Sequence, residues 1–81
     1  MTHKILEKIT PVVREVFENP AMVVTSDLNA DNVADWDSVR HISLIVGIED
    51  ATGVAFTSDE LANLHSIGDF VQLLTVKGYE A

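Results

Sequence analysis

Hydrophobic residues recur at helical spacing along much of the chain, and the first such stretch is the N-terminal one. Apolar positions three and four apart predict an amphipathic helix over about residues 3–18. Pro11 lies inside it, and an internal proline removes one hydrogen bond at a cost of about 3 kcal/mol. We therefore expect either a kink at Pro11 or a first turn that is only loosely joined. The pair Asn19-Pro20 then ends the helix.

The helical spacing disappears over residues 21–36, where polar residues alternate with isolated apolar ones. This stretch predicts a long loop, held to the rest of the protein at points such as Val24, Leu28 and Val33. Trp36 is expected to anchor the end of the loop. A loop of this length without secondary structure is unusual in so small a domain and tends to be functional.

The second helix is defined by its start and stop signals. It is expected to begin at Asp37 or Ser38 and to end at Gly53, because glycine suits the left-handed position just past a helix end. Gly47 lies within this helix at a cost of around 1 kcal/mol relative to alanine. Its small size would allow a close helix crossing.

Two capping boxes follow, and each marks the start of a further helix. Thr57 with Glu60 predicts a short helix through about Leu64, and Ser66 with Asp69 predicts a final helix ending near residues 77–78. The chain is therefore predicted to be all-α. It should form a small bundle of three main helices plus one short helix, with a long loop between the first and second helices and a single domain over residues 1–81.

Length, charge and cysteine content narrow the possible functions. With 81 residues there is room for one modest core, which leaves little space for an enzyme with its own deep cleft. The net charge of −8 argues against nucleic acid, which requires a basic face, and favours basic protein partners. There is no cysteine and no apolar run long enough to span a membrane. We expect a cytoplasmic protein without a membrane span.

The dipeptide Asp37-Ser38 lies where the polar loop gives way to the apolar second helix. A hydroxyl in the first turn of a helix lies beside backbone N–H groups that have no partner within the helix. Those amides and the helix dipole favour a phosphate attached there. Both residues are also good helix caps, so on the dipeptide alone an ordinary helix start is the better interpretation.

The wider sequence context resembles a known family. Asp37-Ser38-Val39 is followed by apolar residues and then by Glu49-Asp50, and this pattern resembles the modification site of acyl carrier proteins. The apolar residues are Ile42, Ile45, Val46 and Ile48. With the order of the helices, the resemblance extends from about residue 4 to residue 77.

The resemblance implies a modification and a role. Ser38 would carry a phosphopantetheine arm, and Asp37 would belong to the modification motif. A separate phosphopantetheinyl transferase would attach the arm from coenzyme A with magnesium. The arm would hold an acyl group as a thioester and present it to other enzymes, so the chain itself would not be an enzyme.

The resemblance also implies that one side of the second helix borders the arm and the partner enzymes. The partner-docking residues would be Val39, Arg40, His41, Ile42, Val46, Glu49 and Asp50. Core packing explains the apolar ones equally well, and a solvated helix face explains the acidic ones. The expected partners are acyl-loading and acyl-processing enzymes of fatty acid or polyketide biosynthesis, and we expect a monomer.

The start of the second helix departs from the family pattern. Carriers of fatty acid synthesis have carboxylates there, whereas this chain has Arg40, His41 and Ser43. These side chains weaken the acidic patch and favour a stand-alone carrier of a specialised pathway. His41 is alternatively a plain surface residue.

Other functions remain as alternatives. A peptidyl or aminoacyl carrier would use the same serine and the same arm, and a non-carrier acidic helical adaptor would leave Ser38 unmodified. A calcium loop beginning at Asp27 is rejected, because its sixth position is Asn32 and its twelfth is Ser38. A hydrolase site formed by Ser38, His41 and Asp37 is not expected. A serine and a histidine one turn apart on an exposed helix have neither an oxyanion hole nor a cleft. The chain's histidines, His3, His41 and His65, show no metal-ligand spacing.

Overall fold

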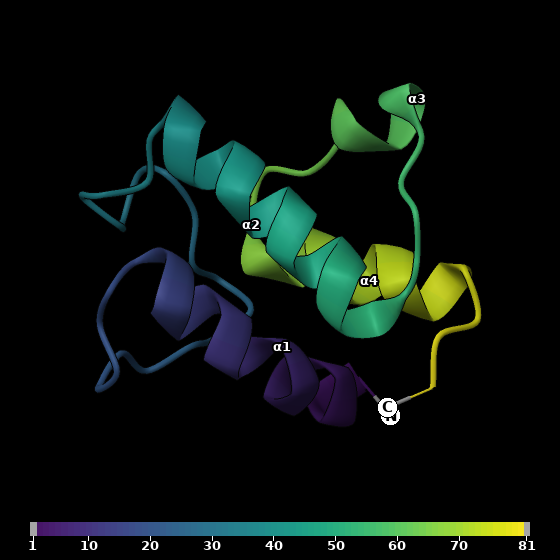
Figure 1. The fold of residues 1–81 in the computed structure, drawn as a ribbon, viewed down its shortest axis with the longest axis horizontal. Helices are drawn as coiled ribbons and strands as arrows, with labels where there is room; N and C mark the ends of the chain where they lie inside the picture. The colour runs from purple at the N-terminus through teal and green to yellow at the C-terminus, as the bar shows by residue number, and fades with distance from the viewer. Residues whose placement is uncertain (1, 81) are drawn as a thin grey trace.

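The computed structural model describes residues 2–80, with side chains from residue 4 onward. It contains four helices: α1 (Thr2–Val16), α2 (Ser38–Thr52), α3 (Ser58–Leu61) and α4 (Ile67–Val76) (Figure 1). α1 packs against both α2 and α4, and the short α3 lies at one end of the molecule in Figure 1. Over the described residues the all-α prediction is confirmed, and none of these helices is long and apolar enough to cross a membrane.

The hydrophobic core lies between α1, α2 and α4. Its side chains come from the apolar stripes of these helices, with additional residues from the loops. The buried residues are Ile5, Ile9, Val13, Phe17, Trp36, Leu44, Ile48, Leu64, Ile67, Phe70, Val71 and Leu74. No polar or charged side chain of the described residues is buried, so the core is a purely apolar contact between helices.

α1 is continuous from Thr2 to Val16 and is not interrupted at Pro11. The expected loosely joined first turn is therefore wrong. Pro11 is exposed, so the hydrogen bond that it cannot donate is lost on the solvent side of the helix. The helix ends two residues before the predicted boundary, because the chain turns at Glu18, whose φ of 54° is left-handed.

Both predicted ends of α2 are confirmed. Asp37 is the N-cap, and its Oδ1 accepts a hydrogen bond of 2.9 Å from the Arg40 N–H. Gly53 follows the last residue with a φ of 71°, and its N–H donates to Glu49 O. A Cβ on Gly47 would lie 2.8 Å from Val12 Cγ1, so this glycine permits the close crossing of α1 and α2.

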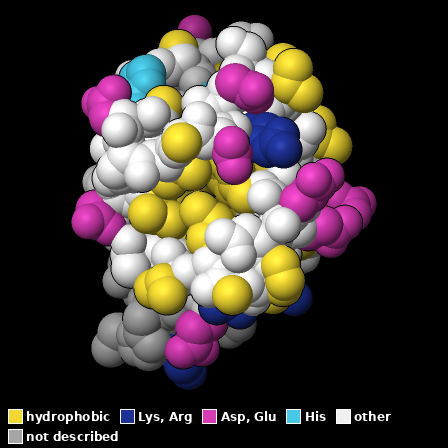
Figure 2. Space-filling model, turned by 90° about the vertical axis from the view of Figure 1, so that its left-hand side faces the viewer, with side chains coloured by type: hydrophobic (Ala, Val, Ile, Leu, Met, Phe, Trp, Pro, Cys, Tyr) yellow, Lys and Arg dark blue, Asp and Glu magenta, His cyan; other side chains and the backbone are white. Residues whose placement is uncertain are grey.

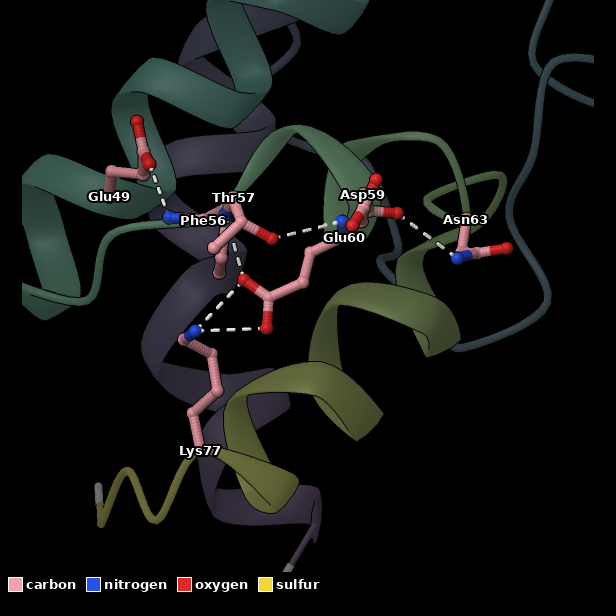
Figure 3. A network of polar contacts seen from close by, with 7 residues as sticks. All are labelled: Glu49, Phe56, Thr57, Asp59, Glu60, Asn63 and Lys77. Carbon is pink, nitrogen blue, oxygen red and sulfur yellow. Dashed lines mark hydrogen bonds and ion pairs between the residues drawn. The ribbon is translucent and has the colours of Figure 1, made fainter.

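The segment from α2 to α3 is held by a small polar network (Figure 3). Glu49 Oε2 accepts a hydrogen bond of 2.7 Å from the Phe56 N–H. Thr57 and Glu60 form the predicted capping box, and Glu60 also pairs with Lys77 at 2.8 Å. These contacts fix α3 between α2 and the end of α4.

The prediction for the end of α3 is wrong. The helix stops at Leu61 rather than near Leu64, and the following residues form a turn. Leu64 is buried although it lies outside the helix. The second capping box, formed by Ser66 and Asp69, begins α4 as predicted, and α4 ends at Val76, next to the predicted boundary.

The long loop is fastened to the start of α4. The N–H of Gly68 donates to Ser26 O at 2.8 Å, and the N–H of Ile67 donates to Leu28 O at 2.9 Å. Next to these two bonds, Asn29 and Ser66 form an isolated antiparallel bridge. The predicted contact points Val24, Leu28 and Val33 pack against the core. The loop therefore reaches α2 along a fixed path, which positions the residues that precede Ser38.

Candidate attachment site at Ser38

Ser38 is the first residue of α2 and is exposed to solvent. The described residues form no hydrogen bond with its hydroxyl, which leaves the oxygen accessible for modification. The amides of Arg40 and His41 donate to Asp37, so those of Ser38 and Val39 are the helix-terminal donors left for an attached anion. Asp37 is thus a cap that fixes the start of the helix at the serine.

A shallow groove of about 480 Å³ lies beside Ser38. It is lined by the loop end, by the first turns of α2 and by the segment between α3 and α4. Besides Asp37 and Ser38, its walls include Trp36, His41, Ile42, Leu61, Leu64 and His65. The groove therefore combines an apolar floor with two imidazole rings next to the exposed hydroxyl.

His41 is half-buried and is joined to the end of the loop. Its Nδ1 accepts a hydrogen bond of 3.1 Å from the indole Nε1–H of Trp36. An acceptor at Nδ1 places the proton of the neutral ring on Nε2. Burial lowers the pKa of His41 below its usual value, and the neighbouring His65 lowers it further. Both effects favour the neutral ring, and a half-buried, hydrogen-bonded His41 is not the plain surface residue of the alternative interpretation.

A row of rings extends through the protein at this point. Trp36 packs against Phe17 of the α1 end with ring centroids 5.6 Å apart, and against His41 at 6.1 Å. His41 in turn lies 6.3 Å from Phe70 of α4. The anchoring role predicted for Trp36 is confirmed. The start of α2 is consequently connected to α1 and α4 through aromatic contacts beside Ser38.

The pKa of His41 predicts how stability depends on pH. Because its pKa is lower in the folded state, folding favours the neutral ring, and this contribution is present above the unfolded-state value of about 6.5. It is lost progressively as the pH falls below that value, since protonation at Nδ1 removes the acceptor for Trp36. We expect urea midpoints to decrease from about pH 8 to pH 5, and more steeply for the wild type than for His41→Gln. Equal slopes for the two proteins would contradict this assignment.

Three apolar side chains of α2 face solvent rather than the core. Val39, Ile42 and Val46 are 71%, 61% and 58% exposed. Figure 2 shows the face on which α2 begins, where hydrophobic side chains gather in the middle and Asp and Glu side chains lie around them. Core packing, the alternative explanation for these three residues, is therefore wrong. The molecule presents an apolar stripe that starts one residue after Ser38.

The charged residues expected on this surface differ in their positions. Asp50 is exposed, whereas Glu49 is half-buried and engaged with the backbone of Phe56. Arg40 is half-buried, and its Nε is buried without a hydrogen-bond partner among the described residues. A purely solvated face thus describes Asp50 but not Glu49, which holds the end of α2 to the next loop.

Sequence reasoning did not place His65, Leu61 and Leu64 in the candidate site. These residues belong to the segment around the α3 end and the α4 start, and only the tertiary fold brings them to the groove beside Ser38. The local signal was the capping box at Ser66, which fixes where the chain turns after His65. No group of acidic, histidine or cysteine residues in the described part of the chain forms a metal site.

Known proteins resemble this chain over most of its length. No protein-family model matches it. The acyl carrier protein of Lactobacillus johnsonii is 30% identical over 71 residues, which cover 88% of this chain and 89% of that protein. The acyl carrier protein of Rhodococcus erythropolis is 31% identical over 81 residues, covering 96% of this chain and 89% of that protein. A solved structure of holo acyl carrier protein from Geobacter metallireducens superposes with a TM-score of 0.77, at 29% identity and 94% coverage of both chains.

Fold and relatives together define a small helical carrier module. The chain belongs to the acyl carrier protein family. Family membership supports a carrier role and implies both a prosthetic group and interaction with acyl-processing enzymes.

Proposed function

We propose that residues 1–81 form a single carrier domain that holds acyl groups as thioesters on a phosphopantetheine arm attached to Ser38. The observation that carries this proposal is the position of Ser38, exposed at the first residue of α2 directly after the Asp37 cap. The structurally similar protein of Geobacter metallireducens is described as holo. The domain would act as the substrate of a phosphopantetheinyl transferase and afterwards of acyl-loading and acyl-processing enzymes.

The residues around Ser38 fit an attached phosphodiester. The hydroxyl is free to react, the amides of Ser38 and Val39 are available at the positive end of α2, and a groove lies alongside. The arm would supply a terminal thiol for thioester formation. The protein would supply a fixed attachment point, because the loop before Ser38 is held by Trp36 and by its bonds to α4. Tethering raises the effective concentration of the acyl group for successive enzymes.

Incubation with coenzyme A, magnesium and a broad-specificity phosphopantetheinyl transferase should add one arm, and only at Ser38. Intact mass should show a single addition in the wild type and none in Ser38→Ala, because the hydroxyl is the group that is modified. Ser43→Ala is the matched control, since Ser43 is an exposed serine in the same helix, and it should be modified normally. If the wild type remains unmodified while a known carrier is converted, an acidic helical adaptor becomes the better explanation.

The apolar stripe on α2 is the part of the surface that we assign to docking. Val39, Ile42 and Val46 are exposed along the part of α2 that follows the serine, and exposed Asp50 lies beyond them. An enzyme that receives the arm must approach this end of the molecule. Arg40 and His41 remain in the proposed surface, Arg40 through its charge and His41 through its position beside the groove. Glu49 would act there indirectly, by holding the end of α2.

Replacing Arg40 with Asp tests how charge acts on partner choice. Arg40 Nε has no hydrogen-bond partner among the described residues, so the substitution breaks no hydrogen bond there. It also places an acidic residue near the start of α2, as in the carriers of fatty acid synthesis. Acyl loading of the holo protein by a fatty-acid-type enzyme that docks on acidic helices should become several-fold faster at low salt, with less gain at high salt. Leaving His41 unchanged avoids the loss of the Trp36 contact. If loading is no faster at low salt, Arg40 has no role in discrimination.

A further inference from the structure

The groove beside Ser38 contains two histidines in different environments. His41 is held by Trp36 and half-buried, and its pKa is lowered, so the ring is neutral with its hydrogen on Nε2. His65 is exposed and lines the same groove from the segment between α3 and α4. Within the described residues His65 forms a hydrogen bond only through its backbone, whose N–H donates to Asp69 Oδ2 at 2.8 Å. The imidazole of His65 is thus available to a ligand in the groove.

A phosphodiester on Ser38 would be a permanent anion beside this groove. Among the residues that line it, the two histidines are the only basic side chains. Asp37 is an acidic member of the same lining, and the nearest guanidinium belongs to Arg40, which is absent from the lining. The Asp37 carboxylate repels an anion at this place, so the anion needs a hydrogen-bond donor that offsets the repulsion. A positively charged donor forms a stronger hydrogen bond than a neutral one.

Resting on the carrier function proposed above, we propose that His65 and His41 position the arm: the imidazole of His65 pairs with its phosphodiester, and His41 donates a hydrogen bond to it from Nε2. The pair would hold the phosphodiester end of the arm beside the groove. Neither residue forms or breaks a bond of the thioester, so both act on the position of the arm.

Charged residues lie on each element that lines the groove, including Asp59 and Glu60 of α3. Asp37 caps α2, Arg40 lies one turn into it, Asp35 belongs to the loop and Asp69 lies in the first turn of α4. A phosphodiester keeps its charge over the range in which histidine titrates. A change in the phosphorus environment between about pH 5.5 and 8 therefore reports on the histidines.

The test uses ³¹P NMR of the holo protein, because the arm contains the only phosphorus. The ³¹P shift should change with pH between about pH 5.5 and 8, the range in which imidazoles titrate. In holo His65→Gln, which is expected to fold because His65 is exposed, the titration should disappear. In holo His41→Gln it should persist, because this variant keeps His65 and loses only the hydrogen bond from His41 Nε2.

The outcomes separate this inference from the carrier function itself. Absence of a ³¹P signal after transferase treatment, with a known carrier converted in parallel, means that Ser38 was not modified and overturns the proposed function. A ³¹P signal whose shift does not change with pH leaves the carrier function intact and overturns the role of His65. A titration that survives in His65→Gln and disappears in His41→Gln overturns the assignment of the charge to His65.

Discussion

Trp36→Ala should lower the free energy of unfolding by about 3–5 kcal/mol, the range for removal of a buried Trp or Phe ring. Only 8% of Trp36 is exposed, and the ring packs against Phe17 and His41. For a domain of this size, 3 kcal/mol corresponds to a decrease of roughly 12–24 °C in Tm. The predicted loss is a large part of the total stability of such domains, which is about 5–15 kcal/mol. The loop before Ser38 should therefore no longer keep its fixed path.

Circular dichroism melting and the initial rate of Ser38 modification measure the two consequences of Trp36→Ala. Trp36→Phe keeps a ring against Phe17 but removes the donor for His41, so its destabilisation should be smaller, about 1–3 kcal/mol. Val23→Ala is the matched surface control, because Val23 is 75% exposed and its loss should change stability by less than about 0.5 kcal/mol. A Tm for Trp36→Ala within a few degrees of the Val23→Ala value would show that Trp36 does not anchor the loop.

Local signals predicted most of the fold. Asp37, Thr57 and Ser66 each begin a helix, because a side-chain oxygen that caps a backbone N–H acts within one turn and needs no tertiary context. The end of α3 was predicted too late because Leu64 continues an apolar pattern. Leu64 is buried by contacts with the core rather than by a place in a helix.

The candidate site was only partly predictable. α2 has apolar residues on both sides: Leu44 and Ile48 are buried, whereas Ile42 and Val46 are exposed. Periodicity alone cannot choose between two apolar faces, and the choice is made by packing against α1 and α4. The same limitation applies to His41, whose neutral state depends on Trp36 and on burial. His65 reaches the groove only through the turn that precedes α4.

Gly68→Ala should destabilise the protein by about 1–3 kcal/mol, although alanine is intrinsically the better helix former. A Cβ on Gly68 would lie 2.9 Å from the backbone oxygen of Ser26, which also accepts the Gly68 N–H at 2.8 Å. Backbone atoms cannot rotate away, so the loop must move from the start of α4. The adjacent bond from Ile67 N–H to Leu28 O would then weaken, and the urea midpoint should fall.

Gly47→Ala provides the matched comparison, because its Cβ would meet a side chain instead: Val12 Cγ1 at 2.8 Å. Shortening that side chain in Val12→Ala should relieve the clash, so the double variant should be more stable than the sum of the single changes predicts. Gly68→Ala should show no such rescue by Ser26→Ala, since the carbonyl oxygen remains. Amide hydrogen exchange at Ile67 and Gly68 should accelerate in Gly68→Ala and not in Gly47→Ala. Unchanged exchange at these two amides would show that the loop is not fastened to α4 through Ser26.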